Sequence, residues 1–121
     1  MRQPLTPGQL LVRGRALIHL RQPEYALKDV QEAYSRREEA TLFPSAIDPM
    51  GDQMWVLLGE VHYLNGDPQT ALSFLDRTAD LYQKEPRFRV LYLKCIESLG
   101  NAQNHQYNKI NFQHYNNKFT I

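Results

Sequence analysis

The chain has 121 residues, which is enough for one small domain. Its 14 basic and 13 acidic residues leave a net charge of +1, without the basic excess by which proteins usually bind nucleic acid. The single cysteine excludes an intrachain disulfide and a zinc site built on several thiolates, and it fits a reducing compartment. Apolar stretches are too short to cross a membrane. We therefore expect a cytoplasmic protein that contacts neither nucleic acid nor a membrane.

The first elements in chain order are two helices. Apolar residues recur at helical spacing over about 7–20 and again from Pro23 to about Ala40, which predicts a helical hairpin over residues 7–40. Two prolines and a glycine then mark residues 41–51 as a loop. The first 21 residues hold four arginines and no acid, so a mitochondrial transit peptide is an alternative explanation of this segment.

The sequence signals are clearest over residues 52–84. An apolar stripe at helical spacing is followed by Asn65-Gly66, where a glycine can end a helix in the left-handed conformation. Asp67 can cap the next helix, and Pro68 fits its first turn, where a missing N–H costs nothing. These signals predict a second helical hairpin over residues 52–84.

The two hairpins are related by an internal repeat of 45 residues. The identical pairs are Gly14 with Gly59, Pro23 with Pro68, Ala26 with Ala71, and Leu27 with Leu72. A glycine inside a helix costs about 1 kcal/mol relative to alanine, so its presence needs a reason. We expect Gly14 and Gly59 to lie where the second helix of each hairpin crosses closely, facing Ala26 and Ala71.

A single helix over residues 87–99, ended by Gly100, is the last element expected. No second helix follows it, because residues 101–121 contain six asparagines and three glutamines, and asparagine favours caps and turns over helix interiors. We expect this Asn/Gln-rich tail to be disordered. The 87–99 helix then lacks a cover, which predicts self-association through an exposed patch of Val90, Leu91, Leu93 and Ile96.

The repeated unit resembles the tetratricopeptide repeat (TPR) family, whose pattern is W-x2-L-G-x2-Y, then A-x3-F, then P. Here the pattern reads Trp55, Leu58, Gly59, His62, Ala71, Leu75 and Pro86, with His62 and Leu75 in the places of aromatic residues. The resemblance covers about two and a half repeats over residues 8–100. It implies an all-α array of antiparallel helix hairpins, an α-solenoid fragment, occupying residues 1–100.

In TPR proteins the first helices of successive hairpins line a concave groove that takes peptides or helices. Carried over by alignment, that lining would be Leu11, Arg15, Ile18, Val56, Glu60, Tyr63, Val90, Lys94 and Glu97. The resemblance thus implies an interaction module or scaffold fragment that binds a peptide or helix of a partner protein. The alternative is a purely structural segment of a truncated, longer repeat protein with no ligand of its own.

Some TPR domains bind the C-terminal carboxylate of chaperones through a clamp of Lys, Asn, Asn, Lys and Arg. The corresponding residues here are Leu11, Arg15, Leu57, Arg87 and Leu91. Only Arg87 keeps a suitable charge, so we expect no chaperone-tail binding. The alternating signs of Arg15, Glu60 and Lys94 indicate a groove of mixed charge instead.

Residues for catalysis are scarce in the sequence. The four histidines are scattered without carboxylates or thiolates at ligand spacing, and no phosphate-binding glycine loop occurs. We expect His62 to fill an aromatic position of the repeat and Cys95 to be a small core residue. The sequence therefore predicts no enzyme activity, no metal and no cofactor.

Overall fold

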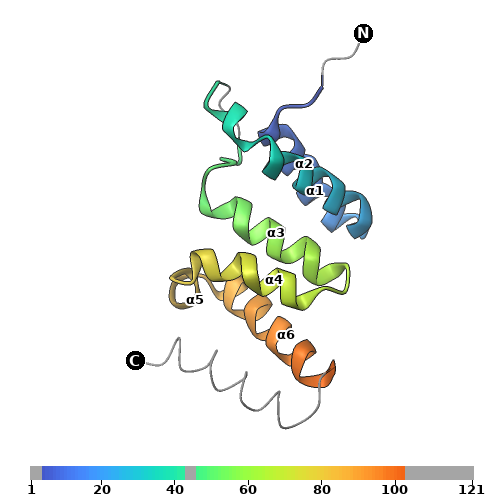
Figure 1. Ribbon diagram of the computed structural model, residues 1–121, viewed down its shortest axis with the longest axis vertical. Helices are drawn as coiled ribbons and strands as arrows, with labels where there is room; N and C mark the ends of the chain where they lie inside the picture. The colour runs from blue at the N-terminus through green and yellow to red at the C-terminus, as the bar shows by residue number, and fades with distance from the viewer. Residues whose placement is uncertain (1–3, 43–45, 103–121) are drawn as a thin grey trace.

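The computed structural model describes residues 4–42 and 46–102, and in these ranges the chain is helical without strands. Four long helices are α1 (Pro7–His19), α2 (Pro23–Ser35), α3 (Asp52–Leu64) and α6 (Pro86–Ala102). Shorter elements are α4 (Pro68–Leu75), α5 (Leu81–Lys84) and the 3-10 helices η1 (Arg37–Leu42) and η2 (Asp76–Thr78). The elements stack in chain order, from α1 and α2 at one end to α5 and α6 at the other (Figure 1). The predicted all-α array of hairpins is confirmed.

Three helix boundaries differ from the prediction. The second helix of the first hairpin ends as an α-helix at Ser35 and continues as η1 to Leu42. The helix expected to run to residue 84 breaks after Leu75 into η2 and α5. Gly100 does not end the last helix, which runs on to Ala102. The tail was predicted to be disordered. From residue 103 onward, it lies outside the described part of the chain.

The break after Leu75 lies at a contact with α6. The hydroxyl of Tyr92 on α6 donates a hydrogen bond of 2.8 Å to the Asp76 carboxylate, which holds the start of η2 against α6. Glu85 then adopts extended backbone, with φ −122° and ψ 106°, as the residue before a proline favours. Pro86 begins α6, so the chain reverses direction within a few residues.

A glycine marks the close approach of the two helices in each hairpin. A Cβ atom added at Gly14 would lie 2.8 Å from Cγ2 of Val30, and one added at Gly59 would lie 2.6 Å from Cγ of Leu75. The predicted close crossing is therefore present in both hairpins. The expected contact with Ala26 is present, because its carbonyl oxygen lies 3.6 Å from the Cβ position of Gly14, although Val30 lies closer. The expected contact with Ala71 was wrong, because Leu75, one turn further along, meets Gly59 instead.

The turns of the two hairpins share one backbone feature. Gly66 has φ +84° in the turn between α3 and α4, as predicted, and Asp67 caps α4 by accepting a hydrogen bond of 3.1 Å from the Thr70 amide. Forty-five residues earlier, Arg21 adopts the same left-handed region with φ +60°. The first hairpin therefore makes its turn without the glycine that normally permits it.

The core has two clusters of buried residues, and an aromatic group packs against the first. The first cluster lies among α1, α2 and α3, and the buried residues of the second come from α4 and α6. In the aromatic group, Trp55 lies 5.7 Å from Tyr34 and 6.2 Å from Phe74, measured between ring centroids. The ring of His62 stacks on Phe74 at 5.5 Å, in the aromatic role predicted for it. Burial lowers the pKa of His62, so its imidazole is uncharged in this packing at neutral pH.

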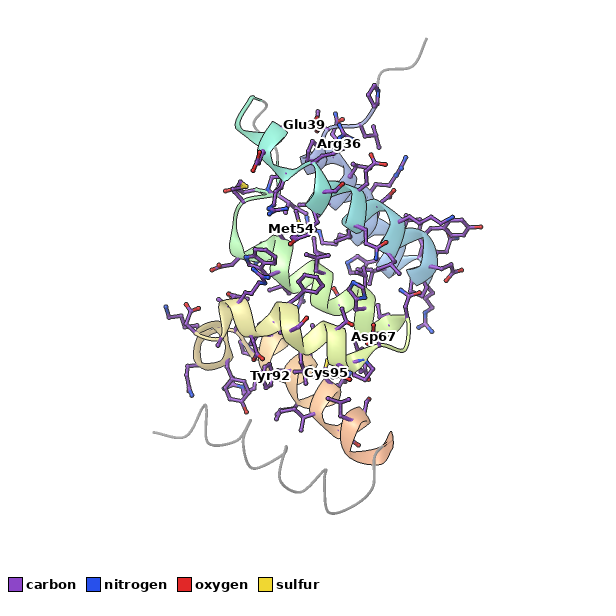
Figure 2. All side chains as sticks on the ribbon, viewed as in Figure 1. Arg36, Glu39, Met54, Asp67, Tyr92 and Cys95 are labelled. Atoms are coloured by element: carbon purple, nitrogen blue, oxygen red, sulfur yellow. The ribbon has the colours of Figure 1, made fainter. Side chains whose placement is uncertain are left out.

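Side chains deep in both clusters are fully enclosed. Met54, Tyr92 and Cys95, labelled in Figure 2, are all completely buried. Burial raises the pKa of the Cys95 thiol to about 12, which keeps it protonated at neutral pH. The prediction of Cys95 as a core residue is confirmed.

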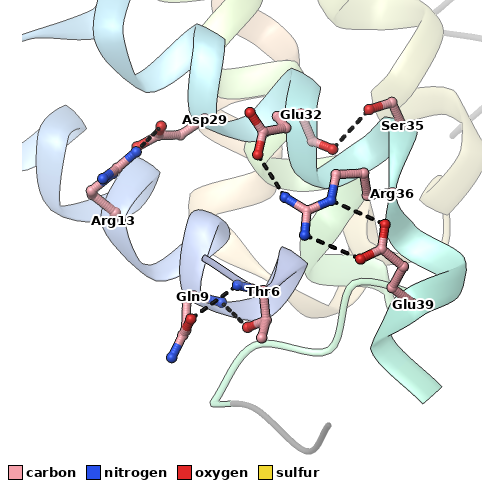
Figure 3. A network of polar contacts seen from close by, with 8 residues as sticks. All are labelled: Thr6, Gln9, Arg13, Asp29, Glu32, Ser35, Arg36 and Glu39. Carbon is pink, nitrogen blue, oxygen red and sulfur yellow. Dashed lines mark hydrogen bonds and ion pairs between the residues drawn. The ribbon is translucent and has the colours of Figure 1, made fainter. Parts of the chain in front are cut away.

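Polar contacts tie the first hairpin together (Figure 3). Thr6 and Gln9 form a capping box at the start of α1, where each side chain bonds to the backbone of the other residue. Arg13 on α1 donates two hydrogen bonds, of 2.7 and 2.8 Å, to the buried carboxylate of Asp29 on α2. Between hairpins, the Asn65 side chain donates to the Pro23 carbonyl at 3.0 Å.

We expect Gly59→Ala to reduce the free energy of unfolding by about 1–3 kcal/mol, because the new methyl group overlaps the buried Leu75 side chain. Urea denaturation measures the change. Gly100→Ala is the matched control, since a Cβ there meets nothing within 4 Å and alanine is the better helix former by about 1 kcal/mol. Equal effects of both substitutions would contradict the close crossing of α3 and α4.

We expect Arg21→Gly to raise the free energy of unfolding by up to about 1 kcal/mol, because glycine adopts a φ of +60° without the clash that other residues incur. Thermal unfolding measures the change, and Arg21→Lys, which keeps the Cβ and the charge, should leave stability unaltered. A loss of stability in Arg21→Gly would show that the left-handed turn is not strained.

Candidate functional site

The face formed by α1, α3 and α6 is hollowed along its length. An inner hollow of about 310 Å³ lies among these three helices, and an outer hollow of about 470 Å³ lies between α3 and α6. Glu60, Arg87 and Leu91 line both hollows, which therefore adjoin. We call the two together the first-helix groove, because the first helices of the hairpins form it.

The structure brings most of the predicted site residues together in this groove. Those that line it are Arg15, Ile18, Val56, Glu60, Tyr63, Val90 and Lys94. Leu11 does not, because it is fully buried in the core cluster of the first hairpin. Glu97 does not either, because it lies on α6 one turn beyond Lys94, the last residue of that helix to reach the hollows. These two assignments were wrong.

Sequence reasoning missed several residues of the groove. His19, Gln53 and Leu64 lie within a turn of predicted residues, so helical spacing could have found them. Arg87 and Leu91 were matched only to the clamp that the sequence excluded. Glu85 comes from the connection before α6, and no sequence signal placed that connection beside α1 and α3.

The groove has an apolar floor and a partly apolar rim. Ile18, Val56 and Leu91 are half-buried along its floor. On the rim of the outer hollow, 52% of Val90 and 43% of Leu64 are exposed, although both are large apolar residues. Such a surface can bind apolar groups of a ligand, because binding removes the apolar surface of the groove and that of the ligand from water.

Glu60 is the most unusual residue of the groove. It is half-buried at the point where the two hollows meet. Burial raises the pKa of its carboxyl group, and the electrostatic effects of His19 and Arg87 oppose that shift without overcoming it. Within residues 4–42 and 46–102, no donor hydrogen-bonds to this carboxylate and no cation lies within ion-pair distance. A ligand that donates hydrogen bonds can supply the donor that this carboxylate lacks among the described residues.

The cations of the groove also lack partners, unlike several elsewhere. Arg15, Arg87 and Lys94 are exposed and make no ion pair with any described residue. Outside the groove, by contrast, Arg13 pairs with Asp29, and Arg36 pairs with both Glu32 and Glu39 (Figure 3). The groove therefore concentrates charges that are available to a ligand.

Other kinds of site are not evident in the described residues. No group of three or more His, Cys, Asp or Glu side chains there could hold a metal ion. None of the helices in these ranges is long and apolar enough to span a membrane. Comparison of the chain with protein-family models, with curated proteins and with solved structures finds no match. The case for function therefore rests on the groove itself.

We expect Glu60→Gln to stabilise the chain at pH 7. The carboxyl group has a higher pKa in the folded chain than in the unfolded chain, so its ionisation above both values favours unfolding. Urea denaturation should show a higher midpoint for Glu60→Gln at pH 7. The gain should shrink as the pH falls through the raised pKa of the folded chain and should be lost below about 4.3, where the carboxyl group is protonated in both states. Glu24→Gln, on the exposed surface of α2, is the control and should give no gain. Destabilisation by Glu60→Gln at pH 7 would contradict this account.

Proposed function

We propose that the chain is a TPR-like interaction module that binds an extended peptide segment of a partner protein in the first-helix groove. The observation that carries the proposal is the groove of two adjoining hollows, which combines an apolar floor with a half-buried carboxylate and cations that lack partners among the described residues. A peptide can contact the apolar floor, the carboxylate and the cations at once, because it offers apolar side chains, charges and backbone donors along its length.

The periodicity of the fold supports the comparison with TPR proteins. The first helices begin at Pro7, Asp52 and Pro86, which are 45 and then 34 residues apart. The second spacing equals the length of a TPR unit, and the first exceeds it by the insert before α3. A cytoplasmic location accords with this proposal, since the one cysteine is a buried thiol.

The second candidate is the structural segment without a ligand, which the open ends of the array favour. At one end, Val12 is exposed on α1 and Leu20 is exposed directly after it, and at the other end Val90 and Leu93 are exposed on α6. Further repeats could stack on these faces, or two copies could associate through α6. The patch on α6 is smaller than predicted, because Ile96 is buried in the second core cluster and Leu91 is half-buried in the groove.

A peptide library separates the two candidates. Random 12-residue peptides displayed on phage are selected against the full chain, and selected peptides are synthesised and titrated by fluorescence anisotropy. We expect Val90→Glu, on the rim of the groove, to weaken binding about tenfold by placing a charge against apolar ligand groups.

Val12→Glu is the matched control, because this exposed valine of α1 lies outside both hollows. It should bind the selected peptides as tightly as the original chain. A selection that enriches no peptide, or peptides whose affinity Val90→Glu leaves unchanged, would contradict the proposed function and favour the structural segment.

A further inference from the structure

We infer that the bound peptide carries an acidic, a basic and an acidic residue at intervals of three, which face Arg15, Glu60 and Lys94 in that order. This inference rests on the proposed function and adds the class of peptide that the groove selects. It follows from the order of charges across the groove, from the distance between neighbouring helices and from the state of Glu60.

The three charged residues occupy equivalent places on three adjacent helices. Arg15, Glu60 and Lys94 are each the ninth residue of their helix, in α1, α3 and α6. Helix α3 contacts both α1 and α6, and all three residues line the hollows. A chain that crosses the helices therefore meets a positive, a negative and a positive charge in turn.

The spacing of the helices sets the spacing of the ligand's charges. Packed helices lie about 8–10 Å apart, and a peptide in the extended polyproline II conformation advances about 3.1 Å per residue with three residues per turn. Three residues of such a peptide thus span about the distance from one helix to the next, and every third side chain points to the same side. The pattern of charges is symmetric, so it holds for either direction of the peptide.

The central basic residue is required by the surroundings of Glu60. Its carboxylate has no hydrogen-bond donor among the described residues, and burial raises its pKa, so a cationic donor from the ligand would stabilise the ionised form. The other charged groups that face this position are His19 from α1, Arg87 from α6 and Glu85 from the connection between α5 and α6. His19 and Arg87 act on the Glu60 carboxyl group without forming an ion pair with it, so neither takes the place of a donor from the ligand.

The residues between the charges contact the floor of the groove. That floor contains Val56 and Leu57 from α3 and Leu91 from α6. Side chains of moderate size with a preference for extended backbone, such as valine and threonine, suit these intermediate positions.

Two peptides of identical composition test the charge order. The first is Asp-Val-Thr-Lys-Val-Thr-Asp, and the second exchanges the first and central residues to give Lys-Val-Thr-Asp-Val-Thr-Asp. Fluorescence anisotropy with the full chain should show about tenfold tighter binding of the first, because the second places like charges against Glu60 and one flanking cation. Equal affinities would overturn the inference.

Exchanging the charge of Glu60 tests the assignment of the central position. Glu60→Lys should bind Asp-Val-Thr-Asp-Val-Thr-Asp about tenfold more tightly than the peptide with central lysine, which reverses the preference of the original chain. Glu60→Gln should abolish the preference for a central lysine and guards against failure of the lysine variant to fold. Glu24→Lys, which changes the same charge on the exposed surface of α2, should leave all preferences as they were.

The outcomes separate the inference from the proposed function. Library peptides that bind the groove and lose affinity in Val90→Glu, but show no preference for a central basic residue, would overturn only the charge pattern. Failure of the library to yield any groove-binding peptide would overturn both. A preference that persists unchanged in Glu60→Gln would assign the central position to another residue and would also overturn the inference.

Discussion

The close approach of two helices at a glycine is the contact on which the rest of this structure depends. At Gly14 and at Gly59, a large apolar residue of the second helix lies directly against the backbone of the first. This contact turns one side of α1 and α3 toward their hairpin partners and leaves another side open. The open sides, together with α6, make the groove, so the packing within the hairpins determines where a ligand can bind.

Buried and half-buried carboxylates differ in their hydrogen-bond partners between the body of the fold and the groove. The buried Asp29 receives two hydrogen bonds from Arg13, which offset the cost of removing its charge from water. Glu60 is half-buried without such a donor among the described residues. Sites that bind ligands often keep a local cost to stability of this kind, because groups satisfied within the protein are not available to a partner.

Signals along the chain were sufficient for the helices, for the Asn65-Gly66 turn and for most of the groove. Alignment with the TPR pattern placed Arg15, Glu60 and Lys94 at equivalent positions of three helices, and the structure has each of them as the ninth residue of its helix. The same alignment placed Leu11 in the groove, and that prediction was wrong. The boundary between the buried side and the open side of α1 depends on where α2 and α3 lie, and Leu11 falls on the buried side.

The sequence by itself determined the local features: the existence of the long helices, the Asp67 cap, the repeat, and the identity of Cys95 and His62 as packed residues. Each depends on hydrogen bonds or apolar periodicity within a few residues of the chain. Only the tertiary structure decided that α4 breaks where Asp76 meets Tyr92, and that the connection before α6 completes the groove beside α1. It also decided that Glu60 lacks a donor in the described chain, because burial and pairing depend on which distant segments meet in space.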